Sequence, residues 1–208
     1  MEPHKQARRA ELAAHRRSAI LEAAKAVFQE AGLEGANIRE IARRAGYTPG
    51  ALYFHFRNKE EIYGDLLAES LERLNDAVRS AGGNARTLRG RLVAKAMAFF
   101  NFYLDHPRDL DLGFYLFHGM KPQGLTPELN ARLNQRLQDA LIPVRSLLRE
   151  AGLGASQAQR EMTALFGHCV GLLLLQHTGR IRLFGQHPAA LYKQYVEQLY
   201  QRVQAGTR

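Results

Sequence analysis

Apolar residues recur at helical spacing along the chain, and no stretch alternates apolar and polar positions as a half-buried β-strand would. Gly and Pro residues separate the periodic segments, with Gly82-Gly83 as the clearest break. A capping box at Ser156 and Gln159 is expected to open one of the later helices. The pattern predicts an all-α fold with helices over about 14–31, 58–80, 107–118, 127–150, 156–178 and 189–204. A further helix is expected to carry Leu88 to Tyr103 and to end before Pro107, in a second unit that starts near Asn84.

Between residues 37 and 58 the helical pattern is cut into two short segments joined by a tight turn. Asn37 is a good N-cap residue, and Gly46 suits the position just after a helix. Thr48 and Pro49 suit the cap and the first residue of a second short helix. Two short helices joined by a Gly-containing turn are typical of the helix-turn-helix unit, although a helical hairpin in an ordinary core is the alternative. The second helix, about residues 49–55, would then lie in the DNA major groove.

Small residues begin this second helix, and hydrogen-bond donors follow them. Gly50 and Ala51 would let the start of the helix approach base edges closely. Donors to phosphate oxygens are expected from Tyr53, His55 and Lys59. Apolar bulk for the opposite side of the helix is expected from Leu52, Phe54 and Phe56. The candidate DNA-binding residues are Asn37, Arg39, Thr48, Gly50, Ala51, Leu52, Tyr53, His55 and Lys59.

In this region the chain resembles the tetracycline-repressor (TetR) family over roughly residues 15–67. The resemblance rests on Phe28, Gly32, Ile38, Ile41, Ala42, Ala45, Gly46, Gly50, Leu52, Tyr53, Phe56, Lys59, Glu60 and Glu61. It implies a homodimeric transcriptional regulator of a partly palindromic operator DNA, usually a repressor released by a small ligand. Three positions depart from the family pattern: Asn37 stands where Thr is common, Tyr47 is bulkier than usual, and Pro49 is an unusual first helical residue.

The net charge of +9 and the pI near 10.0 suit a nucleic-acid partner. Residues 1–63 carry eleven basic and eight acidic residues, and residues 64–208 carry eighteen and twelve, so the excess is not confined to one half. The leading basic cluster is either a DNA-contacting arm or a solvated end: Lys5, Arg8, Arg9, Arg16 and Arg17. We expect an N-terminal arm and helix-turn-helix domain over 1–63, and a helical ligand-binding and dimerisation domain over 64–208.

Other function classes are less well supported by the sequence. No run of eighteen apolar residues predicts a membrane helix, and the basic N-terminus lacks the apolar core of a secretory signal. One cysteine, Cys169, excludes a disulfide within the chain and suits a cytoplasmic location. His168, Cys169 and His177 lack the spacing of a metal or nucleophile site, so we expect no enzyme and no cofactor. A basic protein that coats DNA without sequence preference is the remaining alternative.

Seven of the eighteen aromatic residues fall between residues 99 and 117. They occupy more than one helix face and several have polar tips, which suits a pocket for a small, largely apolar ligand, although core packing explains such clusters too. The candidate ligand-binding residues are Phe99, Phe102, Tyr103, Phe114, Phe117, His118, His168 and Cys169.

The helices over 127–150 and 156–178 form a long amphipathic pair. Small residues on the latter would let another helix come close, either from a symmetry mate in a four-helix bundle or from the same chain. The candidate dimer-interface residues are Leu133, Leu137, Ala164, Gly167 and Gly171.

Overall fold

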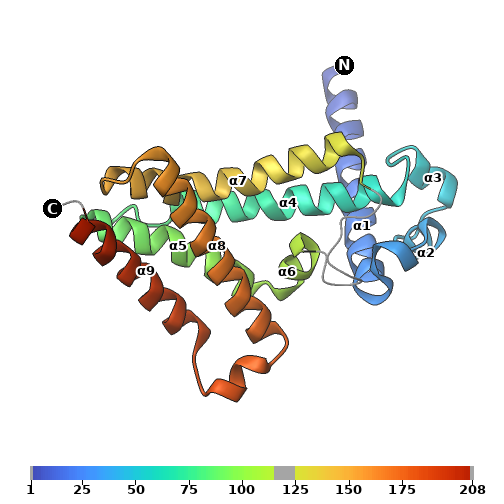
Figure 1. Ribbon diagram of the computed structural model, residues 1–208. Helices are drawn as coiled ribbons and strands as arrows, with labels where there is room; N and C mark the ends of the chain where they lie inside the picture. The colour runs from blue at the N-terminus through green and yellow to red at the C-terminus, as the bar shows by residue number, and fades with distance from the viewer. Residues whose placement is uncertain (1, 115–124, 207–208) are drawn as a thin grey trace. The chain divides into compact units, whose positions relative to one another are not determined.

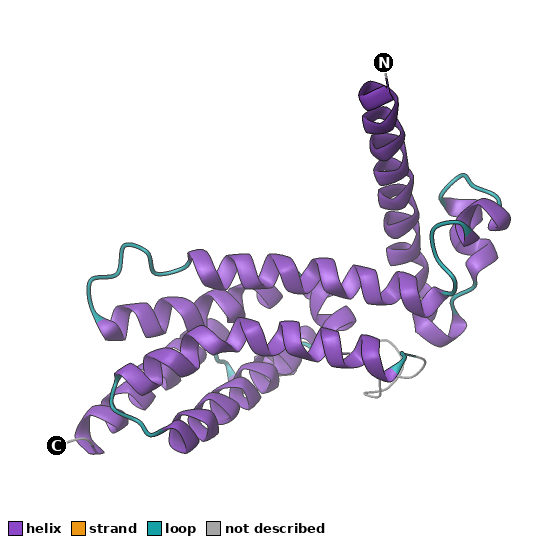
Figure 2. Cartoon of the chain, turned by 90° about the horizontal axis from the view of Figure 1, so that it is seen from above, coloured by secondary structure: helices purple, strands orange, loops and turns teal. Residues whose placement is uncertain are grey.

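The computed structural model describes residues 2–114 and 125–206, without the side chains of 2–5 and 9–10. Within these ranges every regular element is a helix, as Figure 2 shows, which confirms the predicted all-α class. Along the chain these are α1 (Glu2–Gly35), α2 (Ile38–Arg44), α3 (Pro49–Tyr53), α4 (Lys59–Ser80), α5 (Leu88–Asp105), α6 (Pro107–Phe114), α7 (Pro127–Glu150), α8 (Ala155–His177), the 3-10 helix η1 (Arg180–Phe184) and α9 (Pro188–Gly206) (Figure 1).

Two local expectations differ from the structure, and one short helix was not expected. Helix α1 begins at Glu2 rather than near residue 14, so the basic leading segment is helical; Gly32 breaks the helix with φ 67° and ψ 178°. The predicted Ser156–Gln159 capping box is wrong, because Gly154 occupies the N-cap of α8 and makes no side-chain cap. The sequence pattern also gave no sign of η1, which joins α8 to α9.

The helices form two compact units, one containing residues 1–70 with 111–133, the other residues 71–110 with 134–208. Helix α4 contributes to both units, and the predicted boundary at residue 63 falls inside it. The division by function at that point therefore stays a prediction.

The first unit packs α1 against the short helices and the start of α4. Ile20, Ile41 and Leu52 are at most 1% exposed. The ring of Phe28 lies edge-on to that of Tyr63 at 5.5 Å between centroids. The Tyr63 hydroxyl donates to the Leu112 carbonyl at 2.5 Å, so its polar tip is satisfied in the core.

The second unit packs α5 against α9 and α8. Phe100 stacks on Tyr192 at 4.7 Å between ring centroids. Gly82 has φ 77° and turns the chain after α4, as the sequence predicts. Lys95 of α5 donates to the carbonyls of Val78 and Arg79 at 2.8 and 2.6 Å, which satisfies acceptors left open at the end of α4.

Candidate DNA-binding site

Side chains and one left-handed glycine shape the turn between α2 and α3. The Asn37 Oδ1 accepts from the Arg39 N–H at 2.8 Å and caps α2, and the Thr48 Oγ1 accepts from the Ala51 N–H at 3.2 Å and caps α3. Gly46 has φ 75°, a conformation that side chains disfavour. Helix α3 ends at Tyr53, two residues earlier than predicted. The predicted helix-turn-helix is therefore confirmed, with a shorter second helix.

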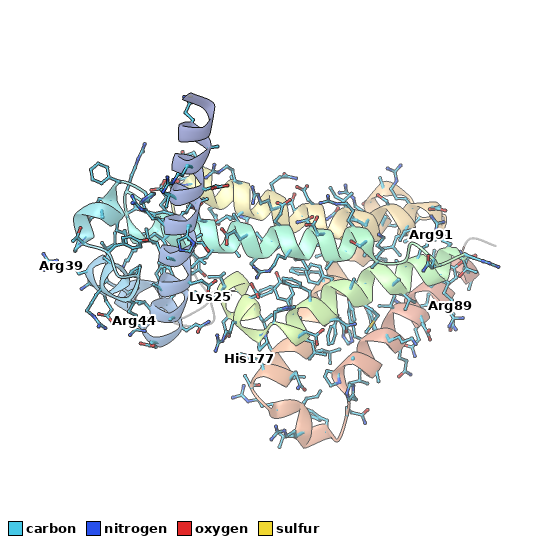
Figure 3. The ribbon with its side chains drawn as sticks, turned by 180° about the vertical axis from the view of Figure 1, so that it is seen from behind. Lys25, Arg39, Arg44, Arg89, Arg91 and His177 are labelled. Carbon is cyan, nitrogen blue, oxygen red and sulfur yellow. The ribbon has the colours of Figure 1, made fainter. Side chains whose placement is uncertain are left out.

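Most of the predicted DNA-binding residues lie on the surface of this unit. Ala51 and His55 are half-buried, whereas the exposed members are Asn37, Arg39, Thr48, Gly50 and Tyr53. A Cβ on Gly50 would meet no atom within 4 Å, so the backbone at the start of α3 is open to a partner. The Arg39 guanidinium has no ion-pair partner among the described residues, and Figure 3 shows it projecting away from α2.

Two expectations about α3 are wrong. Leu52 is fully buried, so it cannot contact DNA directly. Phe54 was expected to supply apolar bulk inside the protein, but it is 92% exposed. Leu52 and Phe56, four residues apart, are both buried, whereas Phe54, two residues from each, falls on the opposite side of the turn.

Several basic residues around the motif already have acidic partners. The Glu40 carboxylate accepts from Arg43 at 2.7 and 2.8 Å and from Arg44 at 2.7 Å. Arg44 also bonds to Glu30 at 2.6 Å and so ties α2 to α1 (Figure 3). Hydrogen bonds from Arg43 and Arg44 lower the pKa of Glu40 to about 2. The spacing of Glu40 to its two arginines is a helical i,i+3 and i,i+4 pattern, a signal that the sequence analysis missed.

Two further cations hold the first unit together. Lys59 is half-buried, and its Nζ donates to the carbonyls of Glu34 and Ala36 at 2.8 and 3.1 Å, just where α1 ends. Arg17 pairs with Asp65 of α4 and lies 5.1 Å from the centre of the Phe56 ring. Of the basic leading cluster, Arg8 and Arg16 are exposed, while the side chains of Lys5 and Arg9 lie outside the described residues.

The predicted ligand-binding residues of the second unit are packed into its core. Phe99, Phe102 and Tyr103 are at most 7% exposed, and burial raises the pKa of the Cys169 thiol to about 12. His168 is half-buried and stacks on Tyr195 at 4.2 Å between ring centroids. A cavity lined by Phe99 and Cys169 has a volume of about 10 Å³, room for no more than about one water.

The other predicted ligand-binding residues do not extend this cluster. Phe114 belongs to the first unit and is half-buried. Phe117 and His118 lie outside the described residues. The ligand pocket therefore stays a prediction.

The small-residue strip predicted for dimerisation lies exposed on α8. Ala164, Gly167 and Gly171 are exposed, and a Cβ on either glycine would meet no atom within 4 Å. A groove of about 610 Å³ runs past both glycines to Thr178 and Arg180. Leu137 is half-buried. Leu133 is only 3% exposed, so its side chain is buried without a second chain. The expectation that Leu133 contacts a second chain is therefore wrong, because its side chain is already packed.

Two negative findings concern the described residues alone. No three His, Cys, Asp or Glu side chains gather there in a way that could hold a metal ion. No helix among them combines the length and the apolar character needed to cross a membrane.

Comparisons with known proteins point to regulators. A family model described as bacterial regulatory proteins of the tetR family matches residues 20–66, which include α2, α3 and the start of α4. The HTH-type transcriptional activator FasR of Mycolicibacterium smegmatis is 40% identical over 91 residues, 44% of this chain and 41% of that protein. The HTH-type transcriptional repressor KstR2 of Mycobacterium tuberculosis is 40% identical over 83 residues, 38% of this chain and 42% of that protein. These matches cover about two fifths of each relative's length.

A solved structure is also similar over most of the chain. The TetR family transcriptional regulator PfmR from Thermus thermophilus superposes with a TM-score of 0.64. It is 20% identical in sequence, and the superposition covers 88% of this chain and 97% of that one. At this identity the likeness extends to the fold and not to ligand or operator.

Proposed function

We propose that this chain, whose residues 20–66 match the tetR family of bacterial regulatory proteins, is a homodimeric, sequence-specific DNA-binding transcriptional regulator. The observation that carries the proposal is the open surface of α2 and α3, where capped helices, a bare backbone at Gly50 and the guanidinium of Arg39 face solvent together. The FasR and KstR2 names describe an activator and a repressor, so both signs of regulation occur among relatives. We take repression as the family's usual mode.

Each proposed DNA contact has a physical role. Thr48, Gly50 and Ala51 lie at the start of α3, where a recognition helix meets base edges. Contacts to phosphates would come from Asn37, Arg39, Tyr53, His55 and the third N–H of Lys59. Arg39 supports this most directly, since a guanidinium without an ion-pair partner in the described part of the chain loses no ion pair there on binding a phosphate.

Dimerisation is supported by the exposed strip of α8. A second α8 could approach closely at Gly167 and Gly171, since neither carries a side chain and no described residue covers them. In a C2 dimer the same strip would meet its copy. Two recognition helices presented in this way would read two half-sites about one helical turn apart or somewhat more.

Release by a small, largely apolar ligand is the part of the proposal that rests on the family alone. The cavity of about 10 Å³ beside Phe99 and Cys169 means that a ligand there would have to displace core side chains. A ligand can shift the protein only by its differential affinity for two shapes, and a coupling of about 1–3 kcal/mol would weaken DNA binding about 5- to 150-fold. The packed core favours a second candidate, the same DNA-binding regulator without an inducer.

Selection from a random duplex library tests the DNA-binding proposal. The unaltered chain should enrich one partly palindromic sequence and protect it from cleavage. If no sequence is enriched and the chain binds all duplexes alike, with an affinity that falls as salt rises, the result would favour the basic DNA-coating protein instead. Small apolar compounds are then added to the complex of the chain with the selected duplex. Dissociation of the complex by one of them would support an inducer. A complex that persists with every compound would support the second candidate, a regulator without an inducer.

A further inference from the structure

Phe54 is the most exposed large apolar residue in the described part of the chain, at 92%. Covering an exposed aromatic ring with an apolar partner lowers the free energy, because the ring is removed from water. Its neighbour Tyr53, 55% exposed, belongs to the proposed DNA-binding surface. Phe54 therefore offers an apolar surface next to the proposed DNA-binding residues.

The local backbone fixes this outward position. Phe54 is the C-cap of α3, with φ −67° and ψ −24°. The N–H groups of His55 and Phe56 both bond to the Leu52 carbonyl, at 2.9 and 3.0 Å, so the turn after the helix is closed. Leu52 and Phe56 are buried on one side of that turn and leave Phe54 on the other.

The length of α3 indicates what the ring meets. Residues at the start of a recognition helix reach the base edges. Helix α3 has five residues and is about 7.5 Å long, so Phe54 lies at the far end of the helix from the residues that would contact base edges. A residue that follows such a helix lies near the groove wall, which consists of phosphates and deoxyribose sugars.

The chemistry of the Phe54 ring decides whether it contacts the phosphates or the sugars of the groove wall. Phenylalanine has no donor and no charge, so it forms no hydrogen bond with a phosphate. The carbon-bound hydrogens of deoxyribose are the apolar surface available at the wall. We propose that Phe54 packs its ring on the sugars of the groove wall and adds DNA affinity that neither reads sequence nor releases counter-ions. This inference rests on the proposed DNA-binding function.

The experiment compares Phe54→Ala with the unaltered chain on two duplexes, one selected from a random library by the unaltered chain and one of unrelated sequence. We expect about a tenfold loss or more on both, since much of a Phe side chain is covered. The slope of log affinity against log salt should not change, whereas Arg39→Ala should reduce it by about two units, because each chain of the dimer loses one phosphate contact. Phe184→Ala is the matched control, because Phe184 is 62% exposed in η1 of the second unit.

Several outcomes would overturn the inference. Unchanged affinity in Phe54→Ala would rule out the proposed contact, and so would an equal loss of affinity in Phe184→Ala. Neither result would contradict the proposed DNA-binding function. A loss confined to the selected duplex, and absent when uracil replaces thymine, assigns the ring to thymine methyl groups instead. Failure of the unaltered chain to bind either duplex overturns the proposed function and this inference together.

Discussion

Lys59 offers a sharp test of how the DNA-binding unit holds its shape. Its ammonium donates to the carbonyls of Glu34 and Ala36, which lie at the end of α1 and lack helical partners. Lys59→Met keeps the apolar stem but removes both hydrogen bonds. A hydrogen bond to a charged group contributes about 1.5–3 kcal/mol, so two such bonds would contribute about 3–6 kcal/mol in a dry site. The site is half-buried, so water can replace the lost donor at both carbonyls and reduce the loss. We expect a loss of about 2 kcal/mol in the free energy of unfolding.

Thermal and denaturant unfolding measure this loss. For a chain of this size, about 2 kcal/mol corresponds to a fall in Tm of about 4–8 °C. Lys25→Met is the matched control, since Lys25 is also half-buried in the first unit and has no hydrogen-bond partner among the described residues. Equal stability of the two variants would refute the argument. The same variant tests the phosphate contact, because a lost contact lowers the salt slope of DNA binding by about one unit per chain, or about two units for the dimer.

Three further predictions concern glycines and the cysteine. Gly50→Leu should abolish operator binding while Tm stays within a few degrees, because the position is exposed and open; retained affinity would exclude the proposed docking of α3. Gly167→Arg should convert the dimer to a monomer by light scattering, while Gly83→Arg, in the exposed turn after α4, should leave the mass unchanged; a dimer in both would exclude α8 from the interface. Cys169 should resist iodoacetamide at about pH 8 until the chain is unfolded, because burial raises the pKa of its thiol to about 12 and keeps it protonated; rapid labelling of the folded chain would contradict this.

The local parts of the site could be predicted from sequence, and the non-local parts could not. Asn37, Gly46 and Thr48 act within three residues of themselves, so their caps and turn follow from residue type alone. The bonds of Lys59 reach carbonyls 23 and 25 residues away, which no local pattern encodes. The sequence analysis placed Phe54 with Leu52 and Phe56 on one side of the second helix. Phe54 is exposed instead, because α3 ends at Tyr53 and the chain turns there.

The aromatic cluster shows a different limit. The sequence predicts a ligand pocket or ordinary core packing, and the burial of Phe99, Phe102 and Tyr103 is compatible with both. Whether such a region encloses a ligand cavity depends on how its side chains fill space, and residue spacing does not record this. The same sequence pattern is compatible with a pocket and with the packed core described around Cys169.

The ratio of affinities for a selected duplex and for the same bases in scrambled order tests the central claim most directly. The measurement is made at physiological salt, because lower salt strengthens the sequence-independent binding that charge alone produces. A sequence-reading dimer predicts a ratio of about 10³ or more. A ratio near one, with both affinities falling together as salt rises, would contradict the account.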